Sequence, residues 1–199
     1  MPEDISKKPV HQPSEADVEI AKRRQQAVVE VLRLFEQHFQ TTLESHPETV
    51  LYAAAWLAGT SLYRSLGYEQ SIAPGTVVLS EKANQQWPKL MNVFVFILGH
   101  DGINITPGDL DYRIPTKNQP RKTILQIQEV FQDQYNEIMR KHGFGYFEGA
   151  VTGAAVCVFA FKFHCILNKQ LDQKLAAAIV AMGFIEGTKT TPIPLKPAA

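Results

Sequence analysis

Cysteine is scarce in this sequence. Its 199 residues include only Cys157 and Cys165, which fall in one predicted helix. At about 1.5 Å of rise per residue, their Cα atoms lie about 12 Å apart, beyond the reach of a disulfide. The sequence is therefore not a disulfide scaffold, and two reduced thiols predict a cytoplasmic protein. No export signal is predicted either, because acids and lysines follow Met1 without an apolar run.

An excess of either charge is also absent. Lys and Arg together number 20, as do Asp and Glu, so the formal net charge is zero. Proteins that bind nucleic acid neutralise phosphates and normally carry a basic surface. The sequence therefore predicts no nucleic-acid partner. The local basic run Lys22-Arg23-Arg24 is interpreted as the solvated face of a helix.

Long apolar runs without charge are missing as well. The most apolar stretch, 143–167, is interrupted by Glu148, Lys162 and His164. A membrane-spanning helix needs about 20 residues with almost no charge. We therefore predict that this stretch is buried inside a soluble protein, and we predict no membrane partner.

The motifs of familiar enzyme classes do not occur. Di-iron bundles need a Glu-x-x-His pair on each of two helices, and the sequence has no such pair. It also lacks Cys-x-x-Cys, His-Glu-x-x-His, a phosphate-binding loop, a dinucleotide glycine fingerprint and a recognisable nucleophile elbow. No cofactor is predicted, and whether the protein is an enzyme stays open.

What the sequence does contain is a series of segments with apolar residues at helical spacing. Ser14 and Ser80 are suited to be N-caps, Pro47 fits a first turn, and Gly67 and Gly143 fit helix ends. These signals predict six helices, over about 14–46, 47–67, 80–98, 124–143, 144–167 and 168–189.

The third of these segments is ambiguous. Pro88 opposes one unbroken helix from Ser80, which favours a kink or a new start near the proline. Three β-branched residues within 92–98 also fit a buried strand. The helix is favoured, and a strand over 92–98 is the alternative.

The predicted fold is all-α, a single-domain bundle or orthogonal array of about six helices with a long central loop over 99–121. The predicted boundaries are a disordered N-terminal arm over 1–13, a helical domain over 14–189 and an extended proline-rich tail over 190–199. Long loops inside compact domains are uncommon and often functional, so the loop 99–121 is of interest.

Three segments are expected at the centre of this fold, because they are rich in alanine or apolar on most sides: 47–67, 144–167 and 168–189. Two of them leave little polar surface for solvent. We therefore predict a homodimer that buries one of these helices across a two-fold interface.

The loop begins with an adjacent His100-Asp101 pair. This dipeptide is similar to the one with which metal-dependent phosphohydrolases of the HD type present two ligands to a divalent metal. Helix capping is the simpler alternative, because a histidine near a helix C-terminus favours the dipole and Asp101-Gly102 fits a turn.

A second polar cluster in the loop consists of Asp109, Asp111 and Arg113. Two carboxylates at this spacing fit a hard cation together with backbone oxygens. The glycine and the terminal glutamate of an EF-hand loop are missing, however. Local turn hydrogen bonds and surface ion pairs are the simpler explanation.

Several charged or titratable residues interrupt the apolar helices: Arg64, Glu148, Lys162, His164 and Glu186. A buried charge is costly unless it is paired, so we predict an ion pair between Arg64 and Glu148. The aromatic residues between Gly143 and Gly149 are suited to line an apolar pocket. Arg64, Tyr146 and Glu148 are therefore the predicted ligand-binding residues.

Two functions follow as hypotheses. The first is a homo-oligomeric binding module for a small apolar ligand or a protein partner, based on the apolar helices and the many aromatic residues. The alternative is a divalent-metal-dependent hydrolase of the HD-like type, in which His100 and Asp101 bind the metal. The sequence names neither the ligand nor the pathway.

Overall fold

The computed structural model describes residues 14–41, 46–68, 72–110 and 113–196. The structure is 74% helical and, within these residues, contains seven α-helices and no strand, which confirms the predicted all-α fold. The predicted N-terminal arm over 1–13 lies outside the described residues, as do positions 197–199 of the predicted tail.

The helices follow one another along the chain as α1 (Glu15–Thr41), α2 (Pro47–Ser65), α3 (Glu81–His100), α4 (Pro107–Leu110), α5 (Ile124–Lys141), α6 (Tyr146–Phe161) and α7 (Gln173–Lys189). A 3-10 turn, η1 (Thr116–Asn118), precedes α5, and a π-helical turn, η2 (Lys162–Leu167), continues α6. The helix that the sequence did not predict is α4, a single turn inside the predicted loop.

Polar caps and turn residues fix several helix ends where the sequence predicted them. The Ser80 hydroxyl accepts a hydrogen bond from the backbone N–H of Ala83 at the start of α3, and Pro47 occupies the first turn of α2. Gly143 has a φ of 72° and follows α5. This left-handed conformation favours glycine, which has no Cβ to clash with the backbone.

Helix α3 is continuous through Pro88, so the alternative of a strand over 92–98 is wrong. Proline removes one backbone hydrogen bond from a helix and crowds the preceding turn. The helix nevertheless persists because one face of it, including Leu90, Phe94 and Leu98, is buried in the core. This burial outweighs both the proline and the β-branched residues.

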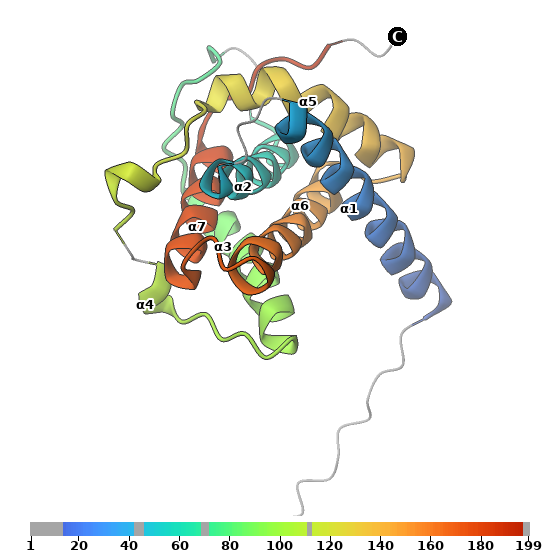
Figure 1. Cartoon of the computed structure of the whole chain (residues 1–199). Coiled ribbons are helices and arrows are strands. Elements are labelled where there is room, and N and C mark those ends of the chain that lie inside the picture. Colours follow the sequence, from blue (N-terminus) through green and yellow to red (C-terminus); the bar gives the residue numbers. More distant parts are fainter. Residues whose placement is uncertain (1–13, 42–45, 69–71, 111–112, 197–199) are drawn as a thin grey trace, which may run out of the picture.

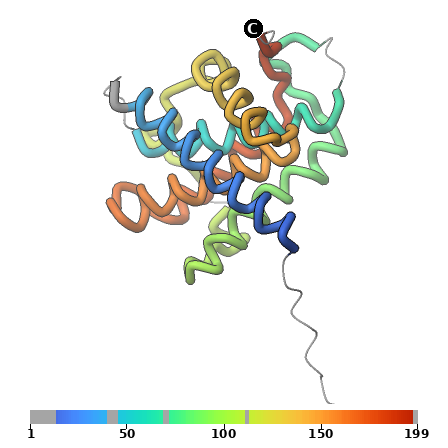
Figure 2. Tube along the Cα trace, turned by 90° about the vertical axis from the view of Figure 1, so that its right-hand side faces the viewer, coloured from blue at the N-terminus to red at the C-terminus, as the bar shows by residue number. Residues whose placement is uncertain are grey.

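Helix α2 lies at the centre of the fold. Figure 1 shows it between α6 and α7, and nearly all of its residues from Glu48 to Tyr63 are buried. Helix α1 lies across the outside of this group, as the blue tube in Figure 2 shows. The segments predicted to be central from their alanine content and apolar character are therefore the ones that pack together.

Helices α2 and α7 touch along their backbones. A Cβ atom built on Gly187 would lie 2.4 Å from the carbonyl oxygen of Trp56 and 3.0 Å from the Cα of Gly59. A Cβ built on Gly183 would lie 2.6 Å from the Cβ of Ala55. The two helices can approach this closely only because a glycine lies on at least one of them at each contact.

The C-terminal end of α6 carries an exposed apolar stripe. Phe159, Phe163 and Leu167 are 48%, 51% and 73% exposed. They are spaced four residues apart along α6 and η2, and residues at this spacing lie on the same side of a helix. We call these three residues the α6 stripe, and Figure 2 shows this orange end of the helix reaching the edge of the molecule.

The whole segment Tyr146–Leu167 is also long and apolar enough, by length and composition, to cross a membrane. It has 22 residues and a hydropathy of 1.8, and it is the one such helix in the part of the chain that the structure describes. Within the fold, 61% of its most apolar window is buried. A helix in the core of a globular domain, covered by its neighbours, can have the same length and apolar composition as a membrane-spanning helix.

After α7 an extended segment, 190–196, lies on α2 and α5. The backbone N–H of Ile193 donates to Gln128 Oε1 at 2.9 Å, and its carbonyl oxygen accepts from Gln132 Nε2 at 2.9 Å and from Arg64 Nη2 at 2.6 Å. Val77 and Thr190 form an isolated antiparallel bridge beside it. These side chains bind the peptide backbone and hold the tail in place.

We expect Gly187→Ala to lower the free energy of unfolding by at least about 2 kcal/mol, because the new methyl group overpacks against backbone that cannot rotate away. Urea unfolding followed by circular dichroism measures this change. Gly99→Ala is the matched control, since a Cβ at Gly99 would meet nothing within 4 Å. In this helix the control should be neutral or stabilising by up to about 1 kcal/mol. Equal effects of the two substitutions would contradict the backbone contact.

Candidate functional site

The first part of the loop between α3 and α5 is fixed to α7. Asp109 Oδ2 accepts hydrogen bonds from the backbone N–H and the hydroxyl of Thr106, at 2.9 and 2.7 Å, and Asp109 Oδ1 lies 3.3 Å from Lys174 Nζ. The hydrogen bonds from Thr106 lower the pKa of Asp109, and Lys174 adds to this effect. The carboxylate thus forms the local turn and the ion pair that were predicted as the simpler explanation. Asp111 lies outside the described residues.

The second part of the loop is fixed to the first turn of α2. Glu48 is buried and accepts a hydrogen bond from Asn118 Nδ2 at 2.5 Å, and its other oxygen lies 3.2 Å from His46 Nδ1. The Thr49 hydroxyl accepts a hydrogen bond from the backbone N–H of Arg121 at 3.0 Å. Both ends of the loop are therefore held by buried or partly buried polar contacts.

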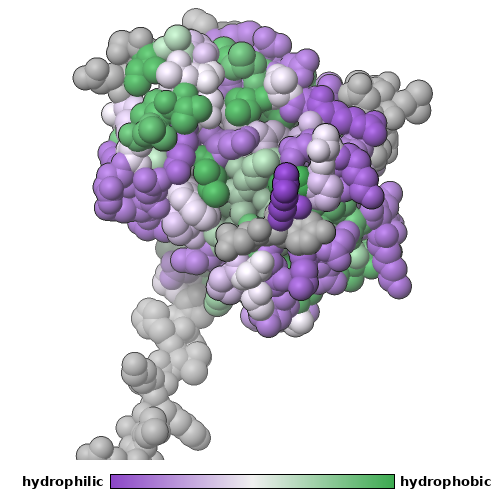
Figure 3. Space-filling model, turned by 90° about the vertical axis from the view of Figure 1, so that its left-hand side faces the viewer, coloured by the Kyte–Doolittle hydropathy of each residue, from purple (hydrophilic) through white to green (hydrophobic). Residues whose placement is uncertain are grey.

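Between these two attachments the loop forms one wall of a pocket, and α7 forms the other. The pocket has a volume of about 880 Å³. Its lining residues come from the loop and from one face of α7: Leu110, Arg113, Ile114, Pro115, Thr116, Gln119, Ala178, Ala181, Met182, Ile185 and Glu186. This volume lies within the range of small-molecule sites, and the pocket is a hollow that is open to solvent. Figure 3 shows this face, where green apolar side chains lie among purple hydrophilic ones.

The α7 wall is apolar apart from one carboxylate, that of Glu186. The hydroxyl of Tyr52, which is buried on α2, donates a hydrogen bond to Glu186 Oε2. Burial raises the pKa of Tyr52, and the negative charge of Glu186 raises it further, so the tyrosine keeps its proton and remains a donor. Tyr52 thus orients a carboxylate toward an otherwise apolar surface.

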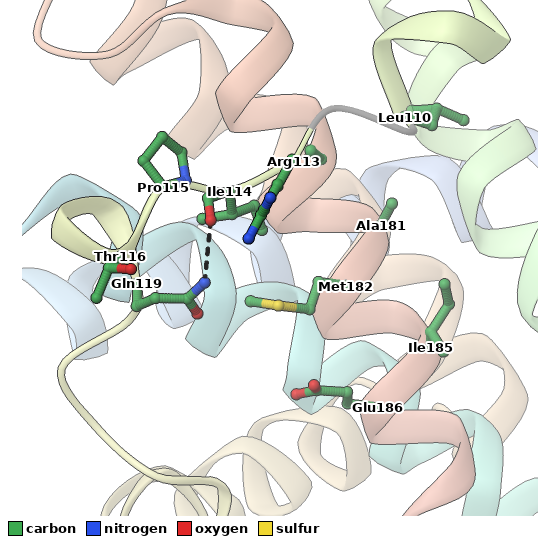
Figure 4. A pocket seen from close by; sticks show the side chains of 11 residues that line it. Leu110, Arg113, Ile114, Pro115, Thr116, Gln119, Ala181, Met182, Ile185 and Glu186 are labelled. Carbon is green, nitrogen blue, oxygen red and sulfur yellow. Dashed lines mark hydrogen bonds between the residues drawn. The ribbon is translucent and has the colours of Figure 1, made fainter.

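The loop wall contributes a charge of the opposite sign. In Figure 4 the Arg113 side chain points from the loop toward the space that Met182 and Glu186 face from α7. Gln119 Nε2 donates to the carbonyl oxygen of Ile114 at 3.3 Å, which helps to hold the loop beside Arg113 in shape. Within the described residues no ion pair joins Arg113 to Glu186.

Two of the three predicted ligand-binding residues lie near each other on a different face. Tyr146 lines a second pocket, of about 970 Å³, and exerts an electrostatic effect on Arg64. Arg64 is half-buried and donates to the backbone of Ile193, and its burial lowers the pKa of its guanidinium. Glu148 is exposed and interacts electrostatically with Arg24. The predicted ion pair between Arg64 and Glu148 is therefore replaced by other contacts, while the ligand-binding role of these residues stays a prediction.

The structure places the predicted metal ligands at the surface. His100 is the last residue of α3, and Asp101 follows as its C-cap. Asp101 Oδ2 lies 2.9 Å from Lys162 Nζ, and this hydrogen bond lowers the pKa of Asp101. Among the residues that the structure describes, no three His, Cys, Asp or Glu side chains are grouped to hold a metal ion. The role of His100 and Asp101 as metal ligands stays a prediction.

Neither Glu186, which lines the pocket, nor Tyr52, which binds Glu186 from α2, was predicted as a site residue, although a sequence signal exists for Glu186. Glu186 stands out as a charged residue in an apolar helix. Tyr52 gave no signal, because a tyrosine in an alanine-rich helix is ordinary core composition. Only the fold brings its hydroxyl to Glu186.

Comparison of the chain with protein-family models, with curated proteins and with solved structures finds no match. The fold and the pocket are therefore the basis for any functional proposal.

Two partly or fully buried histidines, His164 and His46, predict a pH dependence of stability. Burial lowers the pKa of His164, and the hydrogen bond to Gln170 and the charge of Glu48 offset part of this shift. Burial also lowers the pKa of His46. Below the unfolded-state pKa of about 6.5 the unfolded chain therefore binds more protons than the folded one, so stability falls as the pH drops through this window. Urea unfolding at about pH 7.5 and about pH 5.5 should show this loss.

His164→Gln should reduce this loss, because it removes the buried imidazole that resists protonation. His164 Nδ1 lies 2.7 Å from Gln170 Oε1, so the variant retains an amide that can replace this hydrogen bond. His100→Gln, at an exposed position, is the control and should leave the loss unchanged. An identical pH dependence in wild type and His164→Gln would count against the role of His164.

Proposed function

We propose that this protein binds a small organic ligand in the pocket between the loop and α7. The ligand has an apolar body and a cationic head group. The observation that carries this proposal is Glu186, a carboxylate set in an apolar wall and oriented by a buried tyrosine. This proposal narrows the binding module expected from the sequence to one pocket and one class of ligand.

A carboxylate has two oxygens and can accept about four hydrogen bonds. Tyr52 donates to one of the Glu186 oxygens, which leaves the other for a ligand. An ammonium group pairs well with a carboxylate, and charged hydrogen bonds contribute roughly 1.5–3 kcal/mol each. The surrounding Ala181, Met182 and Ile185 would contact the hydrocarbon part of the same ligand.

Methionine suits such a wall because its flexible, polarisable side chain adapts to ligands of different shape. Met182 is partly buried and its sulfur points into the pocket beside Glu186 (Figure 4). The opposite wall offers Ile114 and Pro115. Apolar surface on both sides supports an amphipathic ligand over a small hydrophilic ion.

We further propose that the protein is a homodimer that buries the α6 stripe. Most residues of helices α2 and α7 are buried within one chain, whereas Phe159, Phe163 and Leu167 are exposed. A two-fold axis would place the stripe of one copy against the stripe of another, so each apolar side chain gains an apolar neighbour. This supports α6 as the interface over the other apolar helices.

The state of the cysteines supports a location in the cytoplasm. Cys157 and Cys165 are free and buried. Burial raises the pKa of the Cys157 thiol and raises that of Cys165 to about 12, so both stay protonated and unreactive. Free thiols of this kind are typical of proteins in a reducing compartment.

Hexylamine should bind to the wild-type protein, and Glu186→Gln should weaken this binding at least about tenfold, which corresponds to about 1.4 kcal/mol. Isothermal titration calorimetry measures both affinities. Glu129→Gln removes an exposed carboxylate from α5 and is the matched control. If hexylamine binds neither protein, or binds wild type and Glu186→Gln equally, the proposed cation site is wrong.

The dimer proposal predicts twice the chain mass in sedimentation experiments at micromolar concentration. Phe163→Glu should shift the protein to monomers, because it places a charge in the middle of the α6 stripe. Leu79→Glu changes a side chain that is 90% exposed and lies outside the stripe, and it should leave the dimer intact. A monomeric wild-type protein, or a dimer that tolerates Phe163→Glu, would exclude this interface.

A further inference from the structure

The pocket carries a second charged group whose position restricts the class of ligand further. Arg113 is exposed, lines the pocket from the loop, and points toward the space in front of Met182 (Figure 4). Its guanidinium presents a planar set of donors that matches a carboxylate or another oxyanion with two parallel hydrogen bonds. One pocket therefore has an anionic group on the α7 wall and a cationic group on the loop wall.

These two charges do not neutralise each other. The structure records no ion pair between Arg113 and Glu186 among the described residues, and the partner of the Glu186 carboxylate is the Tyr52 hydroxyl. Apolar surface separates the two groups: Met182 lies on the α7 wall, and Ile114 lies beside Arg113 on the loop wall. Each charge is thus free to bind a group of the opposite sign at its own end of an apolar surface.

A ligand with a single charge pairs with only one of these two groups. A simple amine would be attracted by Glu186 but would bring its positive charge toward Arg113. A simple carboxylate would be attracted by Arg113 but would approach Glu186. Charges of like sign at a binding surface lower affinity, whereas complementary pairs raise specificity.

We infer that the ligand of this pocket is an amphipathic zwitterion, with an ammonium group bound by Glu186, a carboxylate bound by Arg113 and a hydrocarbon part between them. This inference rests on the proposed function, since it specifies the ligand of the same pocket. It assigns Arg113 as the residue that distinguishes aminocarboxylates from plain amines. Tyr52 is a positioning residue, because it acts on the ligand through Glu186.

The test compares three matched series of probes by isothermal titration calorimetry. The zwitterions are γ-aminobutyrate, ε-aminocaproate and its longer homologues, so that one spacing can match the distance between the charges. The corresponding alkylamines and alkylcarboxylates each carry one of the two charges on the same chain. We expect the best aminocarboxylate to bind at least about tenfold more tightly than its matched amine, which equals about 1.4 kcal/mol.

Two variants then separate the contributions. Arg113→Gln should remove the advantage of the aminocarboxylate over its matched amine while the amine still binds. Glu186→Gln should remove the affinity advantage of the aminocarboxylate over the matched carboxylate. Arg140→Gln, which changes a basic residue of the second pocket, is the control and should preserve both advantages.

The outcomes distinguish this inference from the proposed function. If amines bind as tightly as aminocarboxylates of every length, or if Arg113→Gln weakens both classes equally, the zwitterion inference is overturned and the cation site stands. If neither amines nor aminocarboxylates bind, both proposals fail. If the advantage of the aminocarboxylate is lost in Arg113→Gln and kept in Arg140→Gln, the inference is supported.

Discussion

The contact between the backbones of α2 and α7 is the constraint on which the rest of the structure depends. Gly59 and Gly187 bring the two helices together without intervening side chains. This close approach places Tyr52 of α2 within hydrogen-bonding distance of Glu186 on α7. It also turns the remaining face of α7 outward, where Ala181 and Met182 line the pocket. Core packing and site geometry therefore have a common origin.

The loop adds the second half of the site by a different physical means. Polar contacts hold the loop, in place of close packing. At one end Asn118 donates a hydrogen bond to Glu48, and at the other end Asp109 forms an ion pair with Lys174. The contact to Glu48 is buried, and a buried hydrogen bond is costly to leave unmade, so it fixes the position of a segment that has little regular structure. Arg113 lies between the two attachments, facing α7.

Much of the helical framework could be predicted from the sequence, because helix ends depend on local chemistry. Ser80 caps α3, and Gly143 follows α5 in the left-handed conformation. The continuity of α3 through Pro88 could not be predicted with the same certainty, since the burial of Leu90 and Phe94 decides it. Tertiary burial of this kind is not visible in local propensities.

The candidate site was harder to predict, because its residues come together only in the fold. The long loop was predicted to be of functional interest, and Glu186 stands out in the sequence as a charge in an apolar helix. Its partner Tyr52, however, lies on another helix, 134 positions earlier in the chain. The pair expected between Arg64 and Glu148 gave way to backbone contacts, since the extended tail supplies the carbonyl oxygen of Ile193 to Arg64. Sequence spacing gives no information on such long-range partners.

The two walls of the pocket differ in stiffness, and this difference bears on how the protein can change over evolution. The α7 wall belongs to a helix that crosses α2 at glycines, so the backbone of this wall cannot shift without disturbing the core. The loop wall is held at its two ends, and between them Arg113, Thr116 and Gln119 are exposed. Substitutions at these three positions can therefore change the surface of the loop wall at little cost to folding, while the backbone of the α7 wall stays fixed.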